Sequence, residues 1–193
     1  MYEANIKRIL DIVLSVVALL ILSPFLIIVC ILILIDDYGP VFFMQERVGK
    51  NEKKFQVIKF RTMYIDAEKS QKVGVEVTGE DPRITKIGNL LRRFKIDELP
   101  QLFNILRGDM SIIGPRPSLP DYLEIYEEWE RERFKVRPGL SGLAQVNGNI
   151  YLSRIKRSMM DVKYVHELSF LLDLKIIFKT TLVIILGERR FKK

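Results

Sequence analysis

The feature that most constrains this chain is an uncharged, apolar run near its N-terminus, from Ile12 to Ile35. Its 24 residues exceed the length of about 20 that an α-helix needs to cross a bilayer. A secretory signal peptide fits poorly, because its apolar region is shorter and ends in a small-residue cleavage site. An ordinary core helix is disfavoured too, since such a helix alternates apolar and polar faces. The run therefore predicts a helix embedded in a membrane.

Ser23 and Pro24 interrupt this run near its centre. Proline lacks a backbone N–H, clashes with the carbonyl four residues earlier and disfavours helical geometry at the preceding residue. One interpretation is a spanning helix with a proline kink, which membranes tolerate. The other is a re-entrant helix–break–helix, whose halves of about 12 residues, roughly 18 Å each, enter and leave on one side. The Ser23 hydroxyl is then a candidate partner for backbone groups that the proline leaves unpaired.

The charges that flank the run favour the re-entrant interpretation. Lys7 and Arg8 precede it, and basic residues also follow it, namely Arg47, Lys50, Lys53, Lys54, Lys59 and Arg61. The positive-inside rule places both flanks in the cytoplasm, and a single span cannot do that. We therefore expect a re-entrant hairpin over residues 1–36, followed by one domain over residues 37–193 at the membrane interface.

Composition narrows the classes of function. A net charge of +7 predicts an anionic partner: nucleic acid, an acidic membrane surface or a phosphorylated substrate. Cys30 and His166 are the only cysteine and histidine, which excludes a disulfide framework, a cysteine-built zinc site and a multi-histidine metal centre. The sequence also lacks the GxxxxGK[ST] and GxGxxG nucleotide motifs.

Residues 37–193 have the pattern of a mixed α/β domain that is mostly helical. Residues 40–43 and 55–60 are typical of two short strands that form a β-hairpin around a turn at 49–51. Helical patterns cover residues 87–94, 100–106, 118–134, 154–166 and 168–186. The last of these is apolar but contains two lysines, which is typical either of an interfacial helix whose lysines reach water or of a core helix.

Asp97 and Glu98 stand among cations, namely Arg83, Lys86, Arg92, Arg93, Lys95 and Arg107. Carboxylates surrounded by positive charge are expected to have a lowered pKa and to stay ionised at neutral pH, which suits a site that handles an anionic substrate. A structural interpretation is that Asp97 caps the helix containing Pro100, with Glu98 in its first turn. The two interpretations are compatible, because a helix N-terminus also binds phosphate oxygens.

Two rigid segments add further cations. Arg116 stands between two prolines, and Arg137 is followed by Pro138 and Gly139. Proline fixes φ, arginine grips phosphate bidentately, and glycine permits close backbone approach to a ligand. Each segment alone is typical of a tight turn, but together with the acidic pair they indicate an anion-binding site.

Four blocks, in this order, resemble the small monotopic phosphoglycosyl transferases, also called the bacterial sugar transferase family. They are the apolar run with Ser23-Pro24, QERVGKNEKKFQVIKFRTM, IDELPQLFNILRGDMSIIGPRP and VRPGLSGLAQVNG. The resemblance covers almost the whole chain. It implies transfer of a sugar-1-phosphate from a UDP-sugar to undecaprenyl phosphate with release of UMP, as the first membrane step of glycoconjugate assembly. It also implies a monotopic protein of the bacterial inner membrane, whose catalytic domain (residues 37–193) faces the cytoplasm.

The resemblance assigns the nucleophile to Asp97, which would form a covalent phosphosugar intermediate. It implies a magnesium ion, held by Asp97 and Glu98, that neutralises the diphosphate. Glu98 could instead orient Asp97 or take a proton from the acceptor. By position in the motifs, Arg92 is expected to bind phosphate and Arg116 the nucleotide, while Lys59 and Asp173 line the site. We add Arg137 as a substrate-binding residue from its Arg-Pro-Gly setting.

The expected partners are the UDP-sugar, undecaprenyl phosphate and the lipid bilayer, and a homodimer is compatible with the pattern. Nucleic acid is not expected, because the basic stretches lack the interleaved aromatic residues of single-strand binders. A membrane-anchored glycosyltransferase that passes the sugar without its phosphate, and so releases UDP, is the alternative enzyme. Asn149 stands where some relatives carry arginine, so the choice of sugar is not carried over.

Overall fold

The computed structural model describes residues 2, 6–65, 67 and 81–191. It is mostly helical with two small two-stranded sheets, which confirms the predicted mixed, mostly helical class. The helices and strands are α1 (Lys7–Asp36), β1 (Phe42–Val48), β2 (Lys54–Phe60), α2 (Lys86–Arg93), α3 (Gln101–Arg107), β3 (Ser111–Ile113), α4 (Glu128–Arg131), β4 (Gly139–Ser141), α5 (Arg154–Glu167) and α6 (Phe170–Leu186). Short 3₁₀ turns connect several of them.

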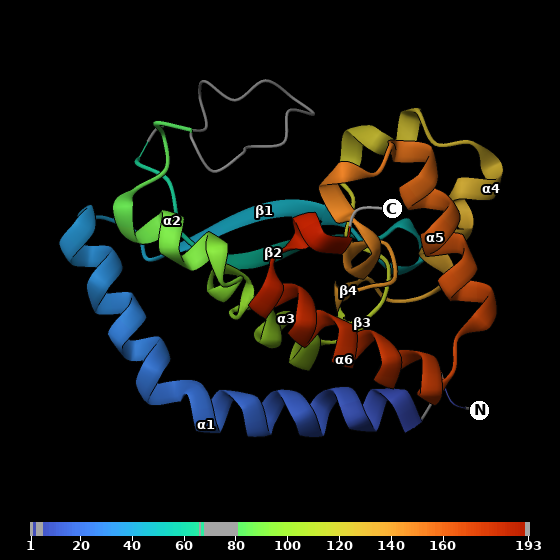
Figure 1. The fold of residues 1–193 in the computed structure, drawn as a ribbon, viewed down its shortest axis with the longest axis horizontal. Helices are drawn as coiled ribbons and strands as arrows, with labels where there is room; N and C mark the ends of the chain where they lie inside the picture. The colour runs from blue at the N-terminus through green and yellow to red at the C-terminus, as the bar shows by residue number, and fades with distance from the viewer. Residues whose placement is uncertain (1, 3–5, 66, 68–80, 192–193) are drawn as a thin grey trace.

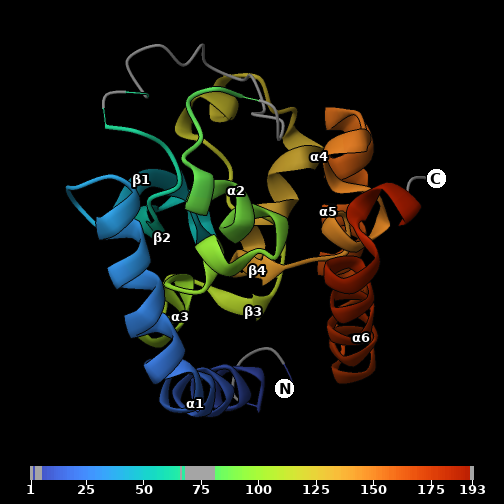
Figure 2. The same cartoon turned by 60° about the vertical axis from the view of Figure 1, so that its left-hand side comes forward.

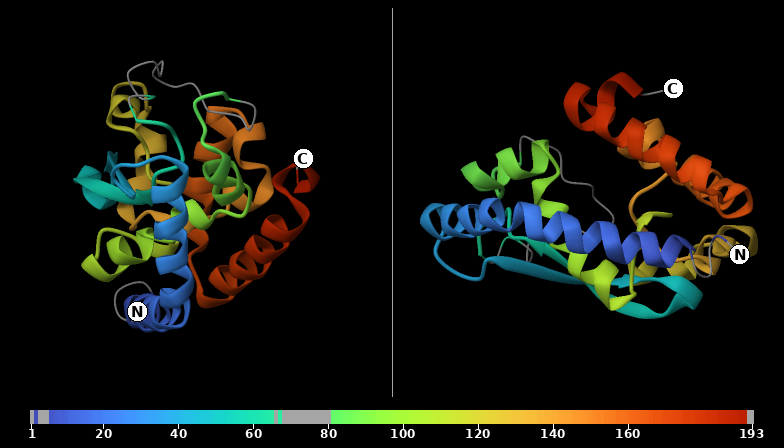
Figure 3. Two further views of the ribbon diagram at one scale, coloured as in Figure 1. Left: turned by 90° about the vertical axis from the view of Figure 1, so that its left-hand side faces the viewer. Right: turned by 90° about the horizontal axis from the view of Figure 1, so that it is seen from below.

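Helix α1 is bent and lies along one side of the molecule, as Figures 1 and 3 show. It contains Pro24, which deprives the Leu20 carbonyl of its usual helical donor. The Ser23 hydroxyl donates to that carbonyl at 2.9 Å, in agreement with the partner expected from the sequence. Contrary to the expected helix–break–helix, α1 therefore continues as one bent helix through Ser23 and Pro24.

The apolar surface of α1 is largely uncovered. An 18-residue window has a mean hydropathy of 3.3, and only 11% of it is buried. By length and composition the helix is capable of crossing a membrane. Both of its ends are nevertheless tied to the rest of the chain, because Arg8 donates to the Ile105 carbonyl at 2.6 Å and Asp36 accepts from the Ile87 amide at 2.8 Å.

Strands β1 and β2 pair antiparallel, from Phe42 opposite Phe60 to Val48 opposite Lys54, which confirms the predicted hairpin. The first strand is longer than expected and continues to Val48. Helix α3 is fastened to β2 by Asn104, which accepts from the Ile58 amide at 3.0 Å and donates to the Gln56 carbonyl at 2.7 Å.

The single helix predicted over residues 118–134 is wrong. The structure has a 3₁₀ turn at Pro120–Glu124, then α4, then a second 3₁₀ turn at Glu132–Lys135. Glu127 starts α4 afresh through a capping box with Glu130, so the helical spacing of the aromatic residues does not reflect one continuous helix. The other predicted helices, α2, α3, α5 and α6, are confirmed to within a few residues.

A short parallel pair, β3 and β4, was not expected from the sequence. It brings the Pro-Arg-Pro segment beside the Arg-Pro-Gly segment. The Gly139 amide donates to the Pro115 carbonyl at 2.9 Å. A Cβ on Gly139 would lie 2.0 Å from the Gly114 nitrogen, so this backbone contact requires glycine.

Helix α6 packs one stripe onto the core and exposes the rest of its apolar surface. Ile176 and Val183 pack with Ile113 and Tyr164, whereas Phe178 and Ile185 point outwards. Figure 2 shows α6 as a separate rod beside the rest of the molecule. An ordinary core helix would have these side chains covered, so the core alternative does not fit, and the interfacial interpretation stays a prediction.

Candidate active site

Asp97 and Glu98 belong to a 3₁₀ turn, Ile96–Glu98, that connects α2 to α3. The turn begins after Lys95, whose φ of 58° reverses the chain in the left-handed region. Both carboxylate residues are buried. The expectation that Asp97 caps the following helix is wrong, because Pro100 is the N-cap of α3 and no side chain caps it.

Glu98 is held by two cations from distant parts of the chain. Its Oε1 lies 2.8 Å from Lys59 Nζ on β2 and 3.0 Å from Arg116 Nη2 in the Pro-Arg-Pro segment. Burial alone would raise the pKa of Glu98, but the charges of Lys59 and Arg116 outweigh it and hold that pKa well below its usual range. Glu98 is therefore ionised at neutral pH. We call Asp97, Glu98, Lys59 and Arg116 the dyad cluster.

Asp97 differs from its neighbour in having a buried oxygen, Oδ1, that accepts no hydrogen bond from the described residues. The lowered pKa expected for both carboxylates is confirmed for Glu98 and wrong for Asp97. Burial raises the pKa of Asp97, and the adjacent charge of Glu98 raises it further, against Lys59, Lys95 and Arg92. An unpaired buried polar atom costs about 1–3 kcal/mol, which a ligand group bound at Oδ1 would offset.

Arg92 approaches the dyad cluster from α2. Its Nε donates to Thr62 Oγ1 at 2.8 Å, and its charge acts on Asp97. Burial lowers the pKa of Arg92. Helix α2 lies this close to Thr62 because residue 88 is glycine, where a Cβ would meet the Thr62 carbonyl oxygen at 2.1 Å. The structure thus brings together five of the predicted residues, namely Lys59, Arg92, Asp97, Glu98 and Arg116.

Two predicted residues lie elsewhere. Arg137 Nε donates to the Gly108 carbonyl at 2.9 Å, at the C-terminal end of α3. Asp173, on α6, is buried in a separate group that we call the Asp173 cluster, formed with Lys7, Tyr2 and Tyr164. The Asp173 carboxylate accepts from Lys7 Nζ at 2.6 Å and from the hydroxyls of Tyr2 and Tyr164 at 2.7 Å each.

Sequence reasoning missed Arg47 as a member of this region. It lies on β1, donates to Gln45 Oε1, and interacts electrostatically with Arg116 and Glu98. Burial, and after it the charge of Arg116, lowers the pKa of Arg47 to about 10. The sequence offered no specific signal, since Arg47 counted only as one of several basic residues after the apolar run.

The donor set fits a hard cation that binds together with phosphate. Among the described residues, no three or more histidine, cysteine, aspartate or glutamate side chains lie together in a group that could hold a metal ion. Mg²⁺, however, is commonly held by one or two carboxylates, with phosphate oxygens and water as its other ligands. The unpaired Asp97 Oδ1 and the neighbouring Glu98 carboxylate would supply that pair.

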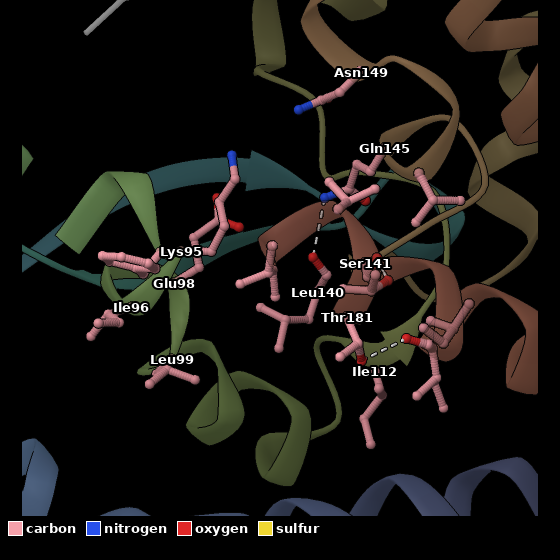
Figure 4. Close-up of a pocket in the computed structure, with 17 residues that line it drawn as sticks. Lys95, Ile96, Glu98, Leu99, Ile112, Leu140, Ser141, Gln145, Asn149 and Thr181 are labelled. Carbon is pink, nitrogen blue, oxygen red and sulfur yellow. Dashed lines mark hydrogen bonds between the residues drawn. The ribbon is translucent and has the colours of Figure 1, made fainter. Parts of the chain in front are cut away.

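A cavity of about 270 Å³ opens beside the dyad cluster (Figure 4). Lys95 and Glu98 lie on one wall, and Gln145 and Thr181 on the other. Most of the lining is apolar, including Phe94, Ile96, Leu99, Ile112, Leu140, Ile177, Val183 and Ile184. The cavity therefore joins a charged end at Glu98 to an apolar wall contributed by α6.

Comparisons with known proteins identify relatives of this chain. The chain is 43% identical over 186 residues to the undecaprenyl-phosphate glucose phosphotransferase of Komagataeibacter xylinus, covering 90% of this chain and 35% of that protein. It is 42% identical over 183 residues to the UDP-glucose:undecaprenyl-phosphate glucose-1-phosphate transferase of Escherichia coli, covering 91% and 39%. It is 40% identical over 187 residues to the exopolysaccharide production protein ExoY of Sinorhizobium fredii, covering 90% and 83%.

The chain thus spans little more than a third of the first two relatives and most of the third. The model of one family, described as bacterial sugar transferase, matches residues 2–187. The chain belongs to the bacterial sugar transferase family.

Proposed function

We propose that this chain transfers a sugar-1-phosphate from a UDP-sugar to undecaprenyl phosphate and releases UMP. The observation that carries the proposal is the unpaired, buried Oδ1 of Asp97 within a group of cations. A nucleophile needs a lone pair that no hydrogen bond occupies, and an anionic substrate needs positive charge around it. Two of the relatives are named for phosphotransfer to undecaprenyl phosphate, which supports the same acceptor here.

In the first step, an Asp97 oxygen attacks the phosphorus that carries the sugar. The bond from this phosphorus to the bridging oxygen breaks, and UMP leaves with that oxygen. In the second step, a phosphate oxygen of the acceptor attacks the same phosphorus and Asp97 leaves, which produces a diphosphate-linked sugar. Arg92 and Arg116 would hold the phosphate oxygens through both displacements.

The environment of Glu98 favours a role as a fixed negative charge over a role as general base. Its pKa is held well below the usual range by Lys59 and Arg116, so it is a weak proton acceptor near neutral pH. It would instead fix Lys59 and Arg116 and, with Asp97, hold Mg²⁺ against the diphosphate. The metal would neutralise the diphosphate when bound.

The mainly apolar cavity supports a lipid acceptor. Its polar end lies at Glu98, and its apolar wall follows α6. A lipid phosphate at the dyad cluster could therefore direct its first hydrocarbon units along this wall, towards the exposed apolar face of α6. Apolar burial of about 25 cal/mol per Å² would favour that placement over water.

The contacts of α1 support a re-entrant, monotopic topology. A straight helix of 30 residues would be about 45 Å long, enough to place its ends on opposite sides of a bilayer. Here Arg8 near its start and Asp36 at its end both bond to residues of one folded domain. The bend at Ser23-Pro24 would then turn the helix back within the membrane, and the basic flanks would place the domain in the cytoplasm.

The nucleotide product and the covalent intermediate test the function. The purified protein is incubated with a panel of labelled UDP-sugars and Mg²⁺, with and without undecaprenyl phosphate. We expect UMP as product, and a phosphosugar adduct on the Asp97 peptide by mass spectrometry when the acceptor is omitted. Asp97→Asn should lose the adduct, and Asp121→Asn, at an exposed aspartate, should keep it. Release of UDP would identify a glycosyltransferase and contradict the proposal.

Cysteine labelling tests the topology in intact membrane vesicles. Single cysteines replace Ile6 or Tyr38 in a Cys30→Ala background, because both positions are exposed at the two ends of α1. A membrane-impermeant reagent should modify both from the same side. Modification from opposite sides would establish a spanning helix.

A further inference from the structure

A buried ion pair lies behind the Pro-Arg-Pro segment. Arg133 Nη2 and Asp161 Oδ2 are 2.7 Å apart, and their side chains are only 7% and 3% exposed. Asp161 is on α5, whereas Arg133 belongs to the 3₁₀ turn that follows α4. Burying two charges costs desolvation energy that their attraction only partly returns. This pair is therefore not explained by stability alone.

The guanidinium of Arg133 is fixed from several directions. Its Nη1 donates to the Tyr126 hydroxyl, and its Cζ lies 5.2 Å from the centroid of the Tyr126 ring. Its Nη2, which pairs with Asp161, also donates to the backbone carbonyl of Arg116 at 2.9 Å. Only a planar, multi-donor group makes these contacts at once, so lysine could not replace it.

The Arg116 carbonyl is the middle of three points at which this segment is fastened. The Pro115 carbonyl accepts from the Gly139 amide, and the Ser118 carbonyl accepts from the Val48 amide, both at 2.9 Å. The Arg116 side chain is 41% exposed, and its Nη2 lies 3.0 Å from Glu98 Oε1. The position of its backbone, set partly by Arg133, decides whether its guanidinium reaches Glu98.

We propose that Arg133, oriented by Asp161, is a positioning residue that holds Arg116 against Glu98. This proposal rests on the proposed function, in which Arg116 and Glu98 act on the nucleotide sugar. Arg133 itself touches no reacting group. A small displacement of a positioned group can cost about 100-fold in rate, so the effect should be measurable.

Arg133→Lys tests the proposal, with Arg154→Lys as the matched control. Arg154 also pairs with a buried carboxylate, Glu130, and lies over the Tyr126 ring, at 5.8 Å. We expect Arg133→Lys to raise the KM for the UDP-sugar about tenfold or more, and Arg154→Lys to change it less than about threefold. Equal effects of the two variants would assign Arg133 a merely structural role.

A double-mutant cycle with Arg116→Lys gives a second measurement. If Arg133 acts through Arg116, the double variant should be no slower than Arg116→Lys alone, because the interaction is already lost. Additive losses would overturn the proposal. Should Arg133→Lys fail to fold, Asp161→Asn enters the same cycle, since it keeps the side-chain volume and one acceptor for Arg133.

Hydrogen exchange separates this proposal from the proposed function. The Gly139 and Val48 amides, which donate to the Pro115 and Ser118 carbonyls, should exchange faster in Arg133→Lys than in the wild type, and Arg154→Lys should leave them unchanged. Unchanged exchange in Arg133→Lys would overturn the positioning role. Failure of the wild type to release UMP, with exchange altered as expected, would contradict the proposed function and leave the positioning of Arg116 supported.

Discussion

The dyad cluster and the Asp173 cluster are both buried groups of opposite charges, but only one of them is complete. Asp173 accepts from Lys7, Tyr2 and Tyr164 in a network that joins α1 to α5 and α6. In the dyad cluster, Glu98 is paired twice while Asp97 keeps an unpaired oxygen. A satisfied network stabilises a fold, whereas an unsatisfied one stores free energy that a ligand can recover.

The largest expected effect is that of Asp97→Asn on activity. Loss of the nucleophile should lower the rate of UMP release by about 10³-fold or more. The free energy of unfolding should not fall, because the substitution removes a buried charge next to Glu98. Initial rates and thermal unfolding in detergent measure the two. A variant that is both active and destabilised would mean that Asp97 belongs to a structural network.

Asp173→Asn should show the opposite behaviour. It leaves Lys7 buried without its charge partner, which should cost about 3 kcal/mol of unfolding free energy. The folded protein should keep its KM for the UDP-sugar within about threefold. Replacing both partners with apolar residues, Lys7→Met and Asp173→Leu, should restore much of the stability. A large rise in KM without loss of stability would instead support the motif-based expectation that Asp173 lines the substrate site.

The pH dependence of the first half-reaction, in which UMP is released, tests how the charges of the dyad cluster act on Asp97. Asp97 must be ionised to attack, and burial and Glu98 raise its pKa, so UMP release without acceptor should fall as the pH drops through that raised value. Lys59→Gln removes a charge that lowers the pKa of Asp97, so this acid limb should move to higher pH. Lys54→Gln, at an exposed pair with Glu46, should leave the limb in place. A limb that moves to lower pH in Lys59→Gln would contradict this electrostatic account.

The sequence was informative where local chemistry decides the structure. The hairpin and the helix that ends at Gly108 follow from alternation and glycine, and the structure has both. The bond of the Ser23 hydroxyl was also expected, but α1 continues through Ser23 and Pro24 as one helix. The sequence failed where local spacing misled or where a distant contact decides. The segment at 118–134 is of the first kind, because Glu127 restarts α4 through a capping box with Glu130, although the apolar spacing is helical.

The site shows the same division. Cations close in sequence to Asp97 drew attention to the dyad, but Lys59 and Arg116 pair with Glu98 only through folding of β2 and the loop after β3. The β3–β4 pair depends on two glycines in contact across the chain, which no local pattern records. The resemblance of four blocks to a known family supplied site residues that spacing alone could not. It also assigned Asp173 to the substrate site, whereas in the structure Asp173 belongs to a cluster with Tyr164 and not to the dyad cluster.

The smallest expected effect is that of Arg137→Ala, which tests where the dyad cluster ends. Arg137 Nε donates to the Gly108 carbonyl at the C-terminal end of α3, as a helix-capping cation does. Its loss should cost about 1 kcal/mol of unfolding free energy and change the KM for the UDP-sugar less than about threefold. The charge of Arg92, by contrast, acts on Asp97, so Arg92→Ala should raise that KM about tenfold or more. Equal rises in KM for the two variants would place Arg137 in the substrate site, as its Arg-Pro-Gly setting suggested. The dyad cluster would then extend to the C-terminal end of α3.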